Sequence, residues 1–147
     1  MSAIESLLNL KRFKEDEARQ QFALMLRELE VEEKRLIGLE ELYDETGRKF
    51  ESAANELIEV SEIRKLNRFL ESLLDKIQHQ KEVIVLKERQ VEESRKLLEE
   101  ASKEKKTFEK LDEKQKDLLN KEIRRKEQIR TDENAVIRHA RKRGDRR

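Results

Sequence analysis

Residues 67–80, NRFLESLLDKIQHQ, decide the fold of this chain. Together with the residue before them, they contain apolar side chains at spacings of four, three and four: Leu66, Leu70, Leu73 and Ile77. Side chains at these spacings lie along one face of an α-helix, and a stripe of this kind is the seam of a coiled coil. Phe69 and Leu74 flank the stripe, where a two-stranded coiled coil has little need of large apolar residues.

The composition favours long helices over a globular domain. Of the 147 residues, 47% are charged and 35% are apolar, and there is no proline and no cysteine. A globular domain is typically about half apolar and about a quarter charged. High charge also fits a disordered chain, but disorder predicts no sustained apolar period. The absence of proline leaves no obligatory helix break, so the periodicity decides in favour of helices.

A first apolar series covers the N-terminal part of the chain. Of sixteen positions at alternating spacings of four and three, twelve are apolar: Ile4, Leu8, Ala18, Phe22, Met25, Leu29, Leu36, Leu39, Tyr43, Phe50, Ala53 and Leu57. The polar positions are Lys11, Glu15, Glu32 and Thr46. Polar residues on a seam fix its register at some cost in stability. Ser2 and Glu5 form an S-x-x-E capping box, which predicts a helix start.

A second series starts at Leu66, and nine of its thirteen positions are apolar. Its phase differs from that of the first series by two residues, which predicts an interruption between two helices. We expect the turn at residues 58–63, with Ser61 as the N-cap of the second helix. A turn near Gly47, where glycine could close a helix, is the alternative.

The predicted fold is all-α, with two long helices in an antiparallel coiled-coil hairpin, because short connections favour antiparallel neighbours. We expect one domain, with a first arm at residues 1–57 and a second at residues 64–117. If the turn centres near residue 60, residues whose numbers sum to about 121 face each other. Residues 118–147 then have no intrachain partner. They are either a fraying, solvated tail or a surface that another protein completes.

The charge is unevenly distributed, although the net charge is only +1. Residues 1–57 carry 9 basic and 14 acidic side chains, residues 58–123 carry 16 of each, and residues 124–147 carry 10 and 4. The basic end suits an acidic protein partner, a nucleic acid or solvent. Because no aromatic side chain follows Phe108 to stack on bases, nucleic-acid binding is the weaker hypothesis.

No pattern in the sequence predicts catalysis, a cofactor or a metal site. A pair of helices lacks the concave, partly dry cavity that an active site needs, and His79 and His139 are sixty residues apart. No apolar run approaches the roughly 20 residues of a membrane span. The start MSAIESLLNL lacks the basic n-region of a signal peptide. We expect a cytoplasmic protein that is not an enzyme and has no small-molecule substrate.

Three segments together resemble the FliJ family, small coiled-coil components of the flagellar type III export apparatus. They are NRFLESLLDKIQHQ at 67–80, KEKKTFEKLDEKQK at 103–116 and DENAVIRHARKR at 132–143. The length, the hairpin architecture and the phase of the seam agree with this family over essentially the whole chain. The alternatives are the related stalk of an injectisome and a generic scaffolding coiled coil.

The resemblance implies a central stalk whose termini enter the pore of a hexameric, FliI-like export ATPase. It also implies contact with an FlhA-like export gate, escort of export chaperones, and a location at the cytoplasmic face of the inner membrane with the flagellar basal body. Such a protein serves flagellum biogenesis, motility and chemotaxis. Membrane contact would be indirect, through the gate.

The resemblance also implies two sets of site residues. The gate-binding candidates are Tyr43, Phe50, Phe69 and Leu73, and the ATPase-binding candidates are Ile123, Ile129, Arg138, Arg141, Lys142 and Arg143. Phe69 would be an exposed anchor for the gate, which explains its place beside the seam. The alternative is that Phe69 folds over Phe50 and widens the seam within the chain.

Overall fold

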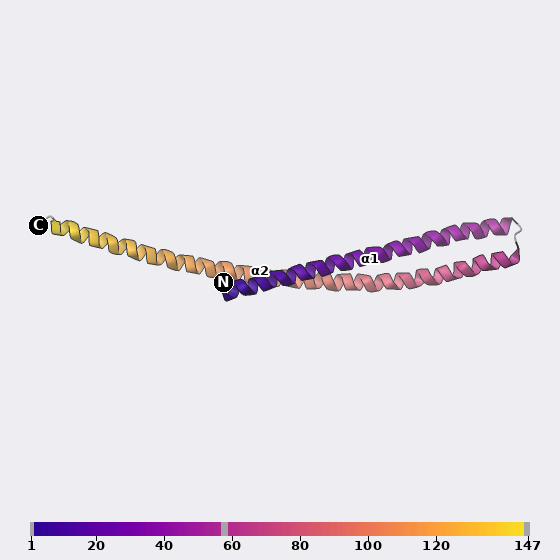
Figure 1. Cartoon of the computed structure of the whole chain (residues 1–147), viewed down its shortest axis with the longest axis horizontal. Coiled ribbons are helices and arrows are strands. Elements are labelled where there is room, and N and C mark those ends of the chain that lie inside the picture. Colours follow the sequence, from indigo (N-terminus) through magenta and orange to yellow (C-terminus); the bar gives the residue numbers. More distant parts are fainter. Residues whose placement is uncertain (1, 57–58, 146–147) are drawn as a thin grey trace. The chain divides into compact units, whose positions relative to one another are not determined.

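The computed structural model describes residues 2–56 and 59–145. These residues form two long helices, α1 (Ala3–Asn55, 53 residues) and α2 (Val60–Asp145, 86 residues), and contain no strand (Figure 1). The two helices pack together as an antiparallel coiled-coil hairpin. The predicted fold class is therefore confirmed.

The chain divides into two compact units. The hairpin unit comprises residues 14–101, and the terminal unit comprises residues 2–13 and 102–145. Within the hairpin unit, Figure 1 shows α1 and α2 running side by side to the link that joins them. Glu28 pairs with Lys87, and Glu32 pairs with Gln80, so the numbers rise along α1 as they fall along α2. This order makes the pairing antiparallel.

The start of α1 is held by the predicted capping box. The Glu5 backbone N–H donates to Ser2 Oγ at 3.1 Å, and the Ser2 backbone N–H donates to Glu5 Oε2 at 3.3 Å. Each side chain thus satisfies a backbone donor that has no partner within the helix. Glu5 also places negative charge near the positive end of the helix dipole.

The second helix begins earlier in the chain than the sequence predicted, at Val60 and not after residue 63. Residues 60–63, expected in the turn, belong to α2, and the Glu59 carbonyl accepts hydrogen bonds from Glu62 and Ile63. Glu59, not Ser61, therefore stands at the N-cap, where its own carboxylate also favours the helix dipole. The Ser61 hydroxyl instead donates to that carboxylate at 3.4 Å. Residues 57–58 of the expected turn, including Leu57 of the first series, lie outside the described residues.

The earlier link changes the register. The numbers of the paired residues Glu28 and Lys87 sum to 115, whereas a turn centred near residue 60 requires about 121. The expected facing pairs were therefore wrong by several residues. The alternative turn near Gly47 is also wrong, because Gly47 lies within α1. Periodicity fixes which residues face the partner helix, but it leaves their exact partners to the position of the link.

The seam itself follows the apolar series closely. Every described position of both series is buried or half-buried, including the polar positions Lys11, Glu15, Glu32 and Thr46. The most buried apolar side chains are Leu8, Ala53, Leu73, Ile77 and Ile84. Among the described residues, no fully buried side-chain nitrogen or oxygen lacks a hydrogen-bond partner. The seam can therefore hold polar side chains without leaving them unsatisfied.

Polar contacts also cross the seam of the hairpin unit. Gln80 Nε2 donates to the Glu32 carboxylate at 2.6 Å and to the Glu32 carbonyl at 2.9 Å. Lys87 Nζ donates to Glu28 Oε2 at 2.8 Å. A shift by one turn of the helix would break both contacts and leave the buried Gln80 side chain without its Glu32 partner. These contacts therefore select one register among those that the apolar stripe allows.

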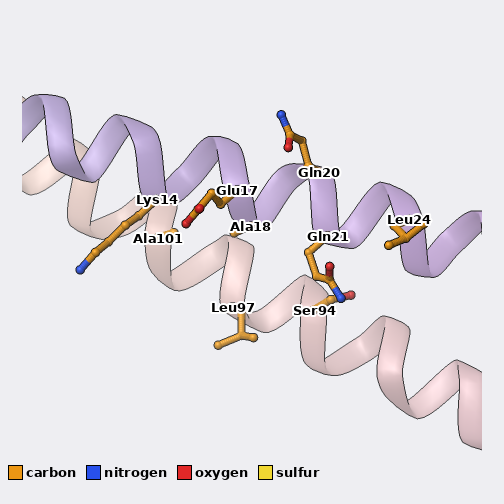
Figure 2. A pocket seen from close by; sticks show the side chains of 9 residues that line it. All are labelled: Lys14, Glu17, Ala18, Gln20, Gln21, Leu24, Ser94, Leu97 and Ala101. Carbon is orange, nitrogen blue, oxygen red and sulfur yellow. The ribbon is translucent and has the colours of Figure 1, made fainter.

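The packing between α1 and α2 is looser where both helices carry short side chains. Ala18 of α1 and Ser94 and Ala101 of α2 line an open hollow there, together with the exposed Leu24 and Leu97 (Figure 2). In Figure 2, the Leu97 side chain extends away from α1. Alanine satisfies the apolar pattern, but its single methyl group buries less apolar area than a larger seam residue would.

We predict that Gln80→Ala destabilises the hairpin by about 2 kcal/mol, because the Glu32 carboxylate loses its cross-seam donor where its side chain is only 14% exposed. Urea titration followed by circular dichroism measures this loss. Gln90→Ala, at an exposed position of the same helix, is the matched control and should change stability by less than about 0.5 kcal/mol. Equal effects of the two changes would mean that the Gln80 contacts do not stabilise the register.

Candidate partner-binding surfaces

The four gate-binding candidates occupy two different environments within the hairpin unit. Leu73 of α2 is 1% exposed and belongs to the core. Tyr43 and Phe50 of α1 are half-buried seam residues. Phe69 of α2 is 42% exposed, beside the seam. Of the four, Phe69 thus offers the most accessible side chain to a partner, whereas Leu73 contributes to the contact between the helices.

Sequence reasoning missed other exposed apolar residues of the hairpin unit. Leu42, which immediately precedes Tyr43, is 40% exposed. Leu74, which the sequence did single out, is 49% exposed on the other flank of the α2 seam. Val31 and Leu86 are 50% and 56% exposed. A count of seam positions ignores such residues, because they follow neither four-three series. An apolar residue at a flanking position was the available signal, and only Phe69 and Leu74 were noted from it.

In the terminal unit, the first turns of α1 are secured to α2 by mixed contacts. Leu8 is 4% exposed. Lys11 Nζ lies 2.9 Å from Glu104 Oε2 and 5.5 Å from the centre of the Phe108 ring, a distance at which a cation and an aromatic ring attract each other. The buried Asp112 accepts a hydrogen bond from Lys116 at 3.0 Å, which raises the pKa of Lys116. These contacts mark the last stretch of α2 that is buried in this unit.

Beyond this stretch the described residues of α2 are exposed. Every residue from 113 to 144 is exposed, although the helix continues to Asp145. We call residues 118–144 the overhang. Its large apolar side chains are 44–68% exposed: Leu118, Leu119, Ile123, Ile129, Val136 and Ile137. The part of the predicted tail that the structure describes is thus a helix with an accessible apolar surface, and not an unstructured segment.

The overhang is also basic towards its end. The ATPase-binding candidates Arg138, Arg141 and Lys142 are exposed, and spacings of three and four place all three on one face of α2. Some acidic side chains of the overhang have partners within the helix. Glu122 accepts a hydrogen bond from Arg125 at 2.7 Å, which lowers the pKa of Glu122, and Asp132 accepts one from Gln128 at 3.1 Å. The surface offered to a partner is therefore both apolar and positively charged.

Two further features bear on what the chain can bind. Neither described helix combines the length and the apolar character needed to cross a membrane. Within the same described residues, no three His, Asp or Glu side chains come together in an arrangement that could hold a metal ion.

We predict that Leu73→Ala and Phe69→Ala differ sharply in their effect on stability. Leu73→Ala should lower the free energy of unfolding by about 2–5 kcal/mol, because it opens a cavity in the core. Phe69→Ala should lower it by only about 1 kcal/mol, because much of the ring is already in water. Urea titrations of the two variants make the comparison. Equal losses would identify Phe69 as a core residue and remove it from the candidate surface.

The comparisons with known proteins agree with the sequence resemblance. The model of one family, described as flagellar FliJ protein, matches residues 1–144. No curated protein and no solved structure matched the sequence. Because the family match covers nearly the whole chain, including both helices, the seam and the overhang, this chain belongs to the FliJ family.

Proposed function

We propose that this FliJ-family protein is the central stalk of a flagellar export ATPase, with the overhang bound in the ATPase ring and the linked end of the hairpin unit directed to the export gate. Family membership supports a role in flagellar export. The stalk proposal rests on one observation: the overhang, residues 118–144, is helical and yet exposed at every residue. A surface of this kind is what a partner protein would cover.

A helix without a packing partner is unfavourable in water. Most helical stability in proteins comes from packing an apolar face, and not from intrinsic propensity. The overhang exposes Ile123, Ile129 and Val136 at 46%, 44% and 68%, so it has apolar area to bury. Its basic end, which includes Arg141 and Lys142, favours a partner with acidic groups. A ring whose pore is lined with apolar and acidic side chains would satisfy both requirements.

A stalk can also act on the ring that holds it. Six equivalent subunits around one asymmetric helix make six different contacts with it. The helix changes the populations of the conformational states of the subunits only if its contacts differ between those states. The distribution of charge on the overhang is asymmetric, since acidic side chains such as Glu122 and Asp132 precede the basic end. This asymmetry supports regulation of the ATPase as part of the proposal.

For the export gate, we propose Phe69 as the anchor. Exposed aromatic side chains are common hot spots of protein interfaces. Leu73 lies one turn further along α2 and would support the anchor from within the core. Tyr43 and Phe50, half-buried on α1, would add their accessible edges. Export chaperones are further proposed partners, and the proposed location is the cytoplasmic face of the inner membrane.

The alternatives have less support. The family match favours a flagellar apparatus over the related injectisome. A generic scaffold would use unpaired seams to associate, but the described seam positions of α1 and α2 are buried or half-buried. Nucleic-acid binding rests only on the basic end of the overhang.

We predict that removing residues 118–147 abolishes co-purification with the export ATPase, while the urea midpoint of the remaining hairpin stays unchanged because the described residues removed are exposed. Neutralising Arg138, Arg141, Lys142 and Arg143 to Gln should weaken binding and reduce its dependence on salt. The matched control neutralises four exposed basic residues of the hairpin unit: Arg64, Lys65, Arg68 and Lys81. ATPase binding that survives truncation but is lost in the control would contradict the proposed orientation.

We predict that Phe69→Ala weakens binding to the cytoplasmic part of the export gate by roughly 30-fold, corresponding to about 2 kcal/mol. Leu74→Ala is the matched control, because Leu74 is similarly exposed on the other flank of the same seam. Isothermal titration calorimetry with the gate domain measures both. If both variants bind like the unmodified chain, Phe69 is not the anchor.

A further inference from the structure

In the hairpin unit, one face of α1 carries apolar residues that do not belong to the seam. Leu24, Val31 and Gly38 follow each other at intervals of seven residues, and Leu42 lies one turn after Gly38. These spacings place all four on one face of the helix. Leu24, Val31 and Leu42 are 44%, 50% and 40% exposed. The chain thus presents an apolar strip on α1 that α2 does not cover.

Gly38 stands in the middle of this strip, and the chain's own packing does not explain it. A Cβ added at Gly38 would meet no atom of the surrounding described residues within 4 Å. Glycine inside a helix is unfavourable compared with alanine, so a position that could hold a side chain but does not requires another reason. Glycine on a helix surface allows a second backbone to come close. Gly38 is therefore suited to a close contact between helices.

The charges on either side of Gly38 would match those of a second copy of α1 that runs antiparallel to the first. Lys34 and Arg35 precede it by four and three residues, and Glu41 follows it by three. If a second α1 crosses antiparallel with the two Gly38 residues in contact, Arg35 of each chain lies opposite Glu41 of the other. A parallel crossing would instead place like charges together. Symmetry forms each favourable pair twice, as in a two-fold contact between identical chains.

The side chains that would form these pairs are accessible. Arg35 is 65% exposed, and its Nη1 lies 3.1 Å from Glu32 Oε1 of its own helix. A guanidinium has five N–H donors, so Arg35 can keep this contact and bind a second carboxylate. Glu41 is exposed. The apolar Val31 and Leu42 would flank the charged pairs on both sides of the crossing.

Gly47 shows that a glycine alone does not create such a surface. It too has no atom of its surroundings within 4 Å of an added Cβ, and at nine residues from Gly38 it lies on the opposite side of α1. Antiparallel self-pairing about Gly47 would place Asp44 opposite Phe50. No opposite charges meet there. The combination of glycine, apolar neighbours and self-complementary charge belongs to the Gly38 face.

From these observations we infer that two copies of this chain associate through the α1 face of Val31, Arg35, Gly38, Glu41 and Leu42, as an antiparallel, two-fold dimer. The contact uses no seam residue, so each hairpin stays intact. It is independent of the proposed stalk function. Because one helix crossing buries a small area, the affinity is on the order of tens of micromolar or weaker.

Sedimentation velocity of the full chain at about 5 to 500 µM tests the dimer, over a range that spans the expected affinity. The sedimentation coefficient should rise with concentration for the unmodified chain. Arg35→Glu alone and Glu41→Arg alone should each abolish the rise, because each places like charges opposite each other. The double variant R35E/E41R should restore it, because the swapped charges are complementary again. Rescue by the double variant cannot arise from a merely structural effect of either change.

Gly38→Gln should also abolish the dimer by blocking the close approach, whereas Gly47→Gln, on the opposite side of α1, should leave it unchanged. Thermal melting by circular dichroism establishes that both variants remain folded. A sedimentation coefficient that does not depend on concentration would overturn the proposal. Failure of the double variant to restore association, or equal behaviour of the two glycine variants, would overturn it as well.

Discussion

The closed seam between α1 and α2 is the contact on which the structure of the hairpin unit depends. Among the described residues, the buried apolar side chains, such as Leu73 and Ile77, all belong to the two seam series. Each helix alone would leave its stripe in water. Because burial of the stripe is the main favourable term, the two helices are stable only as partners.

An apolar stripe alone does not define a single arrangement, since sliding one helix by a turn would still bury leucine against leucine. The polar seam contacts remove this freedom. Gln80 reaches both the carboxylate and the carbonyl of Glu32, and Lys87 reaches Glu28. Each contact would be lost in a shifted register, which would leave the buried Gln80 amide without its Glu32 partner. The polar residues that weaken the periodic pattern are thus the ones that make the structure specific.

A closed seam leaves the outer faces free for other molecules. Phe69 beside the seam, the Gly38 face of α1 and the overhang of α2 are three such surfaces, and they differ in chemistry. The first offers an aromatic side chain, the second self-complementary charge around a glycine, and the third a basic, apolar helix. Because they involve different residues, a change at one surface need not disturb the others or the fold.

The sequence by itself determined the fold class, the capping box at Ser2 and Glu5, the seam residues and the extension of the C-terminal part beyond the first arm, because these follow from helical periodicity and from the lengths of the two apolar series. It did not determine the start of α2 at Val60, the register, or the burial that separates Phe69 from Leu73 as candidate contacts. These depend on how two helices meet. A one-dimensional pattern shows which face is buried, but only the packed pair shows which side chains cross the seam and which remain in water.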